Sequence, residues 1–158
     1  VEQAFHQWFF STPEHQWILS SPLLEKSFCR LHSFLTTADK DLLLNGHRPL
    51  FIPSSGEFAC TVDHPIDHKV ILLYPDLIKL LQSASRFQGI AILLHEIGHI
   101  VSGHSKKEVS TIQAQLEADH FTVGRGLGED LQLFLTDYLR QHPDHKECHI
   151  RLQRLLSN

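Results

Sequence analysis

The sequence predicts an α+β fold in which helices dominate and a small sheet of two or three strands lies in the middle. Apolar residues recur at helical spacing before residue 48 and after residue 75, whereas residues 50–74 hold short β-leaning runs between turn residues. The chain has 158 residues, of which 42% are hydrophobic and 20% charged. This composition suits a single domain over 1–158, with a helical N-terminal part (1–48) and a core (49–158).

The composition also narrows the possible partners. A formal net charge of -4 argues against broad binding to nucleic acid or anionic membrane, so small or peptide-like partners fit better. Three cysteines without C-x-x-C spacing indicate a reducing, cytoplasmic compartment. The apolar run 90–94 is far shorter than the roughly 20 residues that span a bilayer. The chain begins with Val-Glu-Gln, so we expect a trimmed N-terminus.

The first elements are expected to be helices. Ser21-Pro22 reads as an N-cap followed by Pro at the first helical position, which predicts a helix over about 22–36. Its apolar residues follow at helical spacing and are Leu24, Phe28, Leu31 and Leu35. A shorter helix through 42–44 is expected to stop at Asn45-Gly46.

Three short runs predict the strands: 50–52, 58–61 and 69–74. Pro-Ser-Ser-Gly and Asp63-His64-Pro65 separate them and are typical of turns. The sequence therefore predicts a small sheet between two helical regions.

Two helices are expected after the sheet, one over 77–81 and a longer one from about Arg86 to Gly103. The longer helix carries an apolar stripe made of Ile90, Leu93, Leu94, Ile97 and Val101. This stripe predicts that the helix is buried.

Three further helices account for the rest of the chain. Ser105-Lys106-Lys107-Glu108 has the spacing of a capping box and predicts a helix that ends near 124–128. Two more helices flank His142-Pro143. The apolar residues of the three are Val109, Ile112, Leu116 and Val123; Leu131, Phe134, Leu135 and Tyr138; and Ile150, Leu152, Leu155 and Leu156.

The stretch His-Glu-Ile-Gly-His at 95–99 carries the most specific chemistry. In a helix, His95 and His99 share one face and can bind one metal ion, while Glu96 can deprotonate a zinc-activated water. A chance match in a chain with 13 histidines is the alternative, but these polar groups would be costly to bury on an apolar helix without a metal or hydrogen-bonding partners. Gly98 costs up to about 1 kcal/mol of helix propensity, which suggests that another backbone approaches it closely.

The chain resembles a known family at this motif. The stretch 93–104, followed by Leu116-Glu117-Ala118-Asp119, is similar to the gluzincin-type zinc metallopeptidases of the HtpX and CAAX prenyl protease family. A weaker similarity lies at His142-Pro143 with Arg151-Leu152 downstream, and 60–74 could match the family's edge strand. The resemblance extends over roughly residues 50–155.

This resemblance implies a zincin-like metallopeptidase fold and a Zn²⁺ cofactor bound by His95, His99 and a glutamate on the following helix. In the family that glutamate usually lies four residues before the Asp of Glu-Ala-Asp, where this chain has Gln115. Either Glu117 binds zinc after a local helix shift, or Gln115 serves as a weaker neutral ligand, or another residue takes the place. We favour Glu117, because an anionic oxygen suits zinc better than an amide.

Each of the other candidate residues also has an interpretation without a role at the metal site. Asp119 can accept a hydrogen bond from a ligating histidine or be an exposed carboxylate. His142, His145 and His149 fit surface histidines after a Pro turn better than a second metal site. In some relatives the His of the His-Pro stretch reaches zinc, so His142 is a candidate for an extra ligand or for stabilising the oxyanion. Cys60 could bind the metal as an inhibitory thiolate, although a buried strand residue is the favoured interpretation.

A second resemblance, to the ImmA/IrrE-like peptidases, rests on Gly103-His104 after the motif and on the same Glu-Ala-Asp stretch. The metzincin pattern is excluded, because Ser102 and Ser105 stand where it requires Gly and His.

The sequence thus predicts a zinc-dependent metalloendopeptidase that hydrolyses a protein or peptide substrate with a zinc-activated water and Glu96 as general base. The alternative is a latent or pseudo-peptidase whose occluded zinc site belongs to a binding or regulatory module. Gln115 and the histidine-rich C-terminal part keep this alternative open.

Overall fold

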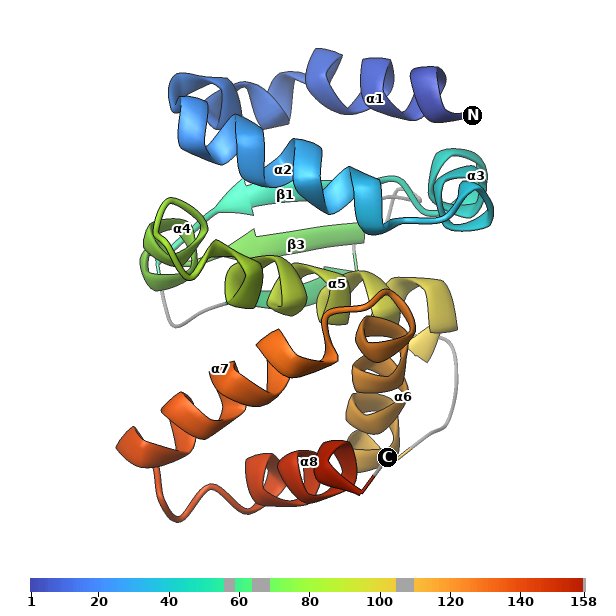
Figure 1. Ribbon diagram of the computed structural model, residues 1–158. Coiled ribbons are helices and arrows are strands. Elements are labelled where there is room, and N and C mark those ends of the chain that lie inside the picture. Colours follow the sequence, from blue (N-terminus) through green and yellow to red (C-terminus); the bar gives the residue numbers. More distant parts are fainter. Residues whose placement is uncertain (56–58, 64–68, 105–109, 158) are drawn as a thin grey trace.

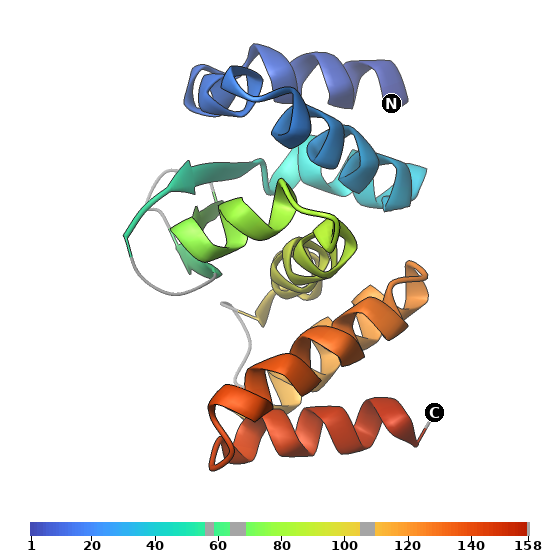
Figure 2. The same ribbon diagram turned by 60° about the vertical axis from the view of Figure 1, so that its left-hand side comes forward.

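The computed structural model describes residues 1–55, 59–63, 69–104 and 110–157, and it describes only the backbone of 59–63. One long helix, α5 (Arg86–Ser102), runs through the middle of the molecule. The N-terminal helices and the sheet lie on one side of α5, and the last three helices lie on the other (Figures 1 and 2). The predicted α+β, helix-dominated fold is confirmed.

The N-terminal layer holds α1 (Glu2–Ser11), a 3₁₀ helix (Pro13–Ser20), α2 (Pro22–Phe34) and α3 (Thr37–Gly46). As predicted, α2 begins at Pro22 and α3 ends at Gly46. Ser21 occupies the N-cap position of α2, but its hydroxyl donates to Gln82 Oε1 at 3.0 Å and does not cap the helix. That bond ties α2 to the end of α4.

The predicted sheet is present and has three described strands, β1 (Pro49–Pro53), β2 (Ala59–Asp63) and β3 (Lys69–Leu73). Their order is β1-β3-β2, with β1 parallel and β2 antiparallel to β3. Phe58 and the predicted turn at 64–65 lie outside the described residues. Among the described strands β2 lies at an edge of the sheet, and this edge strand contacts α5.

The helices after the sheet follow the sequence prediction. α4 (Pro75–Leu81) leads into α5, whose residues from Gly89 to Gly98 are all buried. Gly103 ends α5 in the left-handed conformation with φ 66°, which suits glycine because it has no Cβ. Within the described part of the chain, no helix is long and apolar enough to cross a bilayer.

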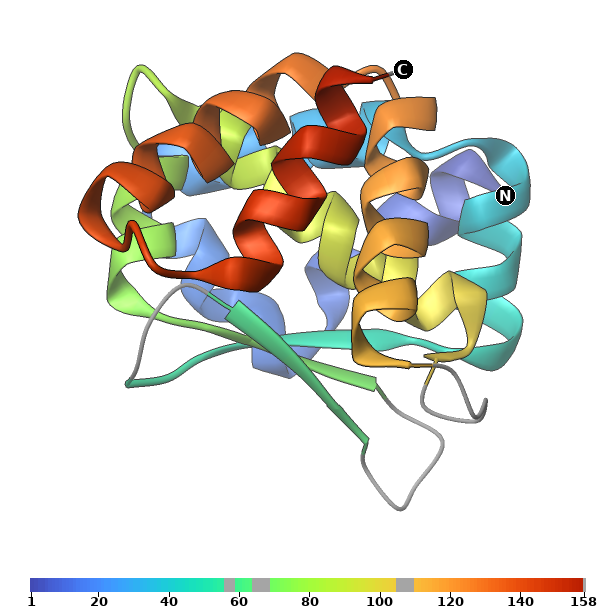
Figure 3. The ribbon, with the colours of Figure 1, turned by 90° about the horizontal axis from the view of Figure 1, so that it is seen from below.

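The C-terminal layer consists of α6 (Thr111–Gly124), α7 (Gly128–Gln141) and α8 (Lys146–Leu156). These helices cover the far side of α5 (Figure 3). The predicted capping box at 105–108 lies outside the described residues, and α6 begins after Ser110, whose hydroxyl accepts from Gln113 N at 3.3 Å.

The predicted helix after His142-Pro143 is present as α8, but its apolar residues are not all buried. Ile150 and Leu156, two of the apolar residues that predicted this helix, are exposed. The buried face instead carries Cys148, Arg151 and Leu155 at i, i+3 and i+7. On this face Cys148 and Leu155 join the hydrophobic core, and the Arg151 guanidinium donates to the buried Asp119.

Candidate metal centre

The two motif histidines face each other from successive turns of α5. His95 Nε2 and His99 Nε2 lie 3.1 Å apart. A tetrahedral metal bound about 2.0–2.1 Å from each nitrogen would hold them about 3.3–3.4 Å apart, so this spacing fits a shared ion. His95 and Glu96 are buried, at 5% and 9% exposure, which keeps both groups out of bulk water.

Asp119 on α6 fixes the tautomer of His95. Its Oδ1 lies 2.8 Å from His95 Nδ1. Arg151 also approaches this nitrogen, at 3.3 Å, but its guanidinium already donates to both oxygens of Asp119 at 2.7 and 2.8 Å. We assign the proton to His95 Nδ1 because the carboxylate contact is shorter and can only accept. The lone pair of a neutral His95 is then on Nε2, facing His99.

Asp119 is itself held in the charged form. Burial would raise the pKa of this carboxyl, but the hydrogen bonds from His95 and Arg151 outweigh burial and lower the pKa. The arrangement is a buried Arg–Asp–His chain from α8 through α6 to α5. Sequence reasoning gave Asp119 this role as one of two options, and the observed contact matches the role of an acceptor for His95.

A second chain of contacts fixes His99. His99 Nδ1 lies 2.8 Å from His104 Nδ1, and His104 Nε2 lies 2.9 Å from Glu117 Oε2. An ionised Glu117 can only accept hydrogen bonds, so we assign the proton of His104 to Nε2. The Nδ1 of His104 then accepts a hydrogen bond from the Nδ1–H of His99. Burial, helped by the nearby His95 and His104, lowers the pKa of His99 to about 3. His99 is therefore neutral, with its Nε2 lone pair turned toward His95.

Gln115 supplies a third electron-rich atom at the same point. Its Oε1 lies 2.8 Å from His95 Nε2. With the tautomers assigned above, Gln115 Oε1 and His99 Nε2 both approach the unprotonated Nε2 of His95, at 2.8 and 3.1 Å. Such a set repels itself unless a cation lies between the atoms or the amide is turned over to donate. The donor chemistry therefore fits a metal ion held by His95, His99 and Gln115.

The packing of α6 on α5 explains why Gln115 occupies this place. A Cβ built on Gly98 would lie 3.1 Å from Ala118 Cα, so the two helix backbones touch there. The close approach predicted for Gly98 is confirmed. Gln115 and Asp119 are four residues apart on α6, share one face, and both contact His95.

Glu117, the ligand favoured from the sequence, lies on a different face of α6. Its contacts include His104 Nε2 through one oxygen and Gln113 Nε2, at 2.9 Å, through the other. Among the described residues, no group of three His, Cys, Asp or Glu side chains is arranged to hold a metal. The candidate third donor is the amide oxygen of Gln115, 2.8 Å from His95 Nε2.

The other predicted site residues have varied positions. His142 caps the end of α7, is exposed, and stacks on Tyr138 with ring centroids 4.4 Å apart. It does not line the cavity beside Glu96, whereas His145 does. The Cys60 side chain lies outside the described part of the structure.

A cavity of about 240 Å³ opens beside His95 and Glu96, between α5, α7 and α8. Its apolar walls are Ile92, Leu131, Phe134 and Leu135. The cavity is smaller than the roughly 300–1,000 Å³ of drug-sized sites, so its volume suits one large side chain.

Sequence reasoning assigned no role to Arg151 or His104. The signal for Arg151 was a charged residue at the centre of the buried stripe of α8, between Cys148 and Leu155. The signal for His104 was its place directly after Gly103, because a left-handed glycine at the end of a helix turns the chain back on itself.

Comparison with known proteins agrees with this site. Residues 64–134 match the family model of peptidase family M48, which is less than half of the chain but includes the His-Glu-Ile-Gly-His motif and the Glu-Ala-Asp stretch. No curated protein and no solved structure matches the chain. The matched region supports a relationship to the M48 metallopeptidases and suggests a hydrolase.

Proposed function

We propose that this chain is a zinc-dependent metallopeptidase that hydrolyses peptide bonds. One observation carries the proposal: Gln115 Oε1 and His99 Nε2 lie 2.8 and 3.1 Å from His95 Nε2, and His95, Gln115 and Glu96 line the same cavity. The match to family M48 supports the same chemistry. Within that family we favour the HtpX and CAAX prenyl protease branch, on the resemblance of 93–104 and 116–119, although Gln115 departs from its pattern.

Each residue has a separate part in the reaction. His95, His99 and Gln115 would hold the ion, and Asp119 with Arg151 keeps His95 in the tautomer that binds it. When bound, zinc would polarise the scissile carbonyl and make a water acidic near neutral pH. Glu96 takes the proton of the attacking water and returns it to the leaving amine.

The substrate has two places to bind. The edge of β2 lies next to α5 and can pair with an extended peptide backbone. The cavity beside Glu96 can take one side chain of that peptide, against Leu131 and Leu135. The two features together favour an extended peptide segment over a small molecule.

Glu96→Gln tests the proposal, with the exposed Glu129→Gln as the matched control. The probes are casein and a quenched-fluorescent peptide library of mixed sequence, with zinc added. We expect Glu96→Gln to bind zinc normally and to lose about 10²–10⁴-fold in cleavage rate, as for a lost general base, whereas the control cleaves like the wild type. Wild-type turnover in Glu96→Gln would end the peptidase claim.

Gln115 favours one second candidate, a pseudo-peptidase whose zinc site serves binding or regulation. A neutral amide binds zinc less strongly than the carboxylate usual in the family. This candidate requires a wild-type protein that binds zinc but cleaves none of the probes. Gln115→Glu then tests whether the missing anionic donor is the cause, because it would raise zinc affinity and introduce cleavage.

A further inference from the structure

We propose that His104 and Glu117 are positioning residues that orient His99 for metal binding, so that each motif histidine is held by its own carboxylate. Asp119 holds His95 directly, whereas Glu117 holds His99 through the imidazole of His104. The inference rests on the proposed metal site but assigns two residues that take no part in binding the metal themselves.

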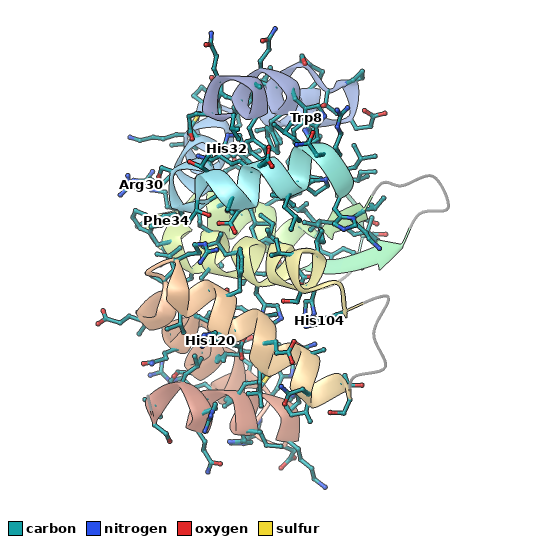
Figure 4. The ribbon with its side chains drawn as sticks, turned by 90° about the vertical axis from the view of Figure 1, so that its right-hand side faces the viewer. Trp8, Arg30, His32, Phe34, His104 and His120 are labelled. Carbon is teal, nitrogen blue, oxygen red and sulfur yellow. The ribbon has the colours of Figure 1, made fainter. Side chains whose placement is uncertain are left out.

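The turn after α5 makes this contact possible. Gly103, with φ 66°, donates its N–H to the carbonyls of His99 and Ile100 and ends the helix directly before His104. His104 thereby lies between the end of α5 and α6 (Figure 4). Its side chain is only 6% exposed, whereas that of Glu117 is 37% exposed. A buried imidazole thus connects the candidate ligand His99 to a carboxylate that stays partly in water.

Both ends of this chain are fixed. Gln113 Nε2 donates to Glu117 Oε1 at 2.9 Å from one turn earlier on α6, which holds the carboxylate in place. At the other end, His104 accepts the Nδ1 proton of His99, so the Nε2 lone pair of His99 is left for the ion. Fixing the tautomer and ring orientation in this way raises metal affinity, because the ligand pays no cost to reorient.

The same geometry explains the position of Glu117 in the sequence. Glu117 stands two positions before Asp119, so the two carboxylates point from different faces of α6. Asp119 reaches His95, and Glu117 reaches His104 near the end of α5. The position of Glu117 on α6 therefore suits a hydrogen bond with His104, although it is not the position at which the family has its ligand.

The test is zinc affinity, measured by competition with a chromophoric chelator on His104→Ala, Glu117→Ala and the double variant. His120→Ala, an exposed histidine on α6, is the matched control. We expect each single variant to bind zinc about 10–100-fold more weakly, as for other residues that orient ligands. The double variant should lose no more zinc affinity than the single variant that binds zinc more weakly, because both substitutions break the same series of hydrogen bonds. The control should bind like the wild type.

Two further measurements separate positioning from other roles. His104→Gln keeps an acceptor and a donor and should recover part of the affinity, and the absorption spectrum of the Co²⁺ form should be unchanged in Glu117→Ala. Wild-type zinc affinity in His104→Ala, or additive losses of affinity in the double variant, would overturn the proposal that His104 and Glu117 orient His99. A changed Co²⁺ spectrum in Glu117→Ala would instead make Glu117 a ligand. If the wild type binds no zinc, the proposed metal site is wrong, and so is the positioning role of His104 and Glu117.

Discussion

Asp119→Asn separates the two tasks of the buried Arg–Asp–His chain. The carboxylate accepts two hydrogen bonds from Arg151, at 2.7 and 2.8 Å, and lies 2.8 Å from His95 Nδ1. An asparagine keeps one accepting oxygen, but its NH₂ group would face donors of Arg151 or His95, and the negative charge of the carboxylate is lost. The substitution therefore leaves the charge of the buried guanidinium without a counter-charge and removes the carboxylate that fixes the tautomer of His95.

The cost has two parts that can be measured separately. Breaking a buried ion pair by removing one partner costs about 3–5 kcal/mol, and the remaining oxygen places this change near the lower end. For a chain of this size each kcal/mol lowers Tm by about 2–4 °C, so we expect a fall of about 6–12 °C in the metal-free protein. Zinc affinity should also fall about 10–100-fold, because a residue that orients a ligand is lost.

Asp39→Asn is the matched control. Asp39 is also buried and accepts the same forked pair of bonds from Arg125, at 2.7 and 2.8 Å, but it lies at the start of α3. We expect a similar fall in Tm by calorimetry and an unchanged zinc Kd. If Asp119→Asn keeps wild-type zinc affinity, or if both variants lose it equally, Asp119 does not orient His95.

Three further predictions concern packing and pH. Gly98→Ala should weaken zinc binding and lower Tm, because overpacking against the α6 backbone costs about 1–3 kcal/mol and exceeds the gain in helix propensity. The control Gly124→Ala, with open space around it, should neither change zinc binding nor lower Tm. Leu135→Phe should fill the cavity and slow peptide cleavage without changing zinc affinity, whereas Leu139→Phe, one turn away and outside the cavity, should not slow it. Burial lowers the pKa of His32 to about 3, from 6.5, so the unfolded state gains a proton first as pH falls below 6.5. His32→Phe should therefore lose less stability than the wild type between pH 6.5 and 3, by about 1.4 kcal/mol per pH unit, in urea unfolding at several pH values.

The reason for the low pKa of His32 is local. The side chain is buried in the N-terminal layer (Figure 4), and neither ring nitrogen has a hydrogen-bond partner among the residues that the structure describes. Phe5 and Phe9 contact it edge-on, with ring centroids 5.0 and 4.4 Å away. A protonated ring would carry an uncompensated charge among these aromatic side chains, which is why a phenylalanine is expected to remove the pH dependence.

The elements that the sequence predicted well have local signals. Ser21-Pro22 marks the start of α2, and Asn45-Gly46 marks the end of α3, because cap residues act within one turn. The spacing of His95 and His99 places them on one helix face whatever surrounds that helix. Gly98 indicated the close approach of α6, since a glycine in a buried helix needs a packing reason.

The third donor needed information that is not local. Whether Gln115 or Glu117 faces His95 depends on how α6 is rotated about its own axis, and the contact between Gly98 and Ala118 sets that rotation. The sequence preference for Glu117 rested on charge alone. Likewise, the buried position of Arg151 depends on Asp119, which is 32 residues away in the chain and on another helix.

The most direct test of the account is a crystal structure of the zinc-loaded wild-type protein with an anomalous map at the zinc edge. The expected result is one ion bound by His95 Nε2, His99 Nε2 and Gln115 Oε1, with Glu117 hydrogen-bonded to His104 outside the coordination sphere. No zinc at this point, or zinc bound by Glu117 in place of Gln115, would contradict the account.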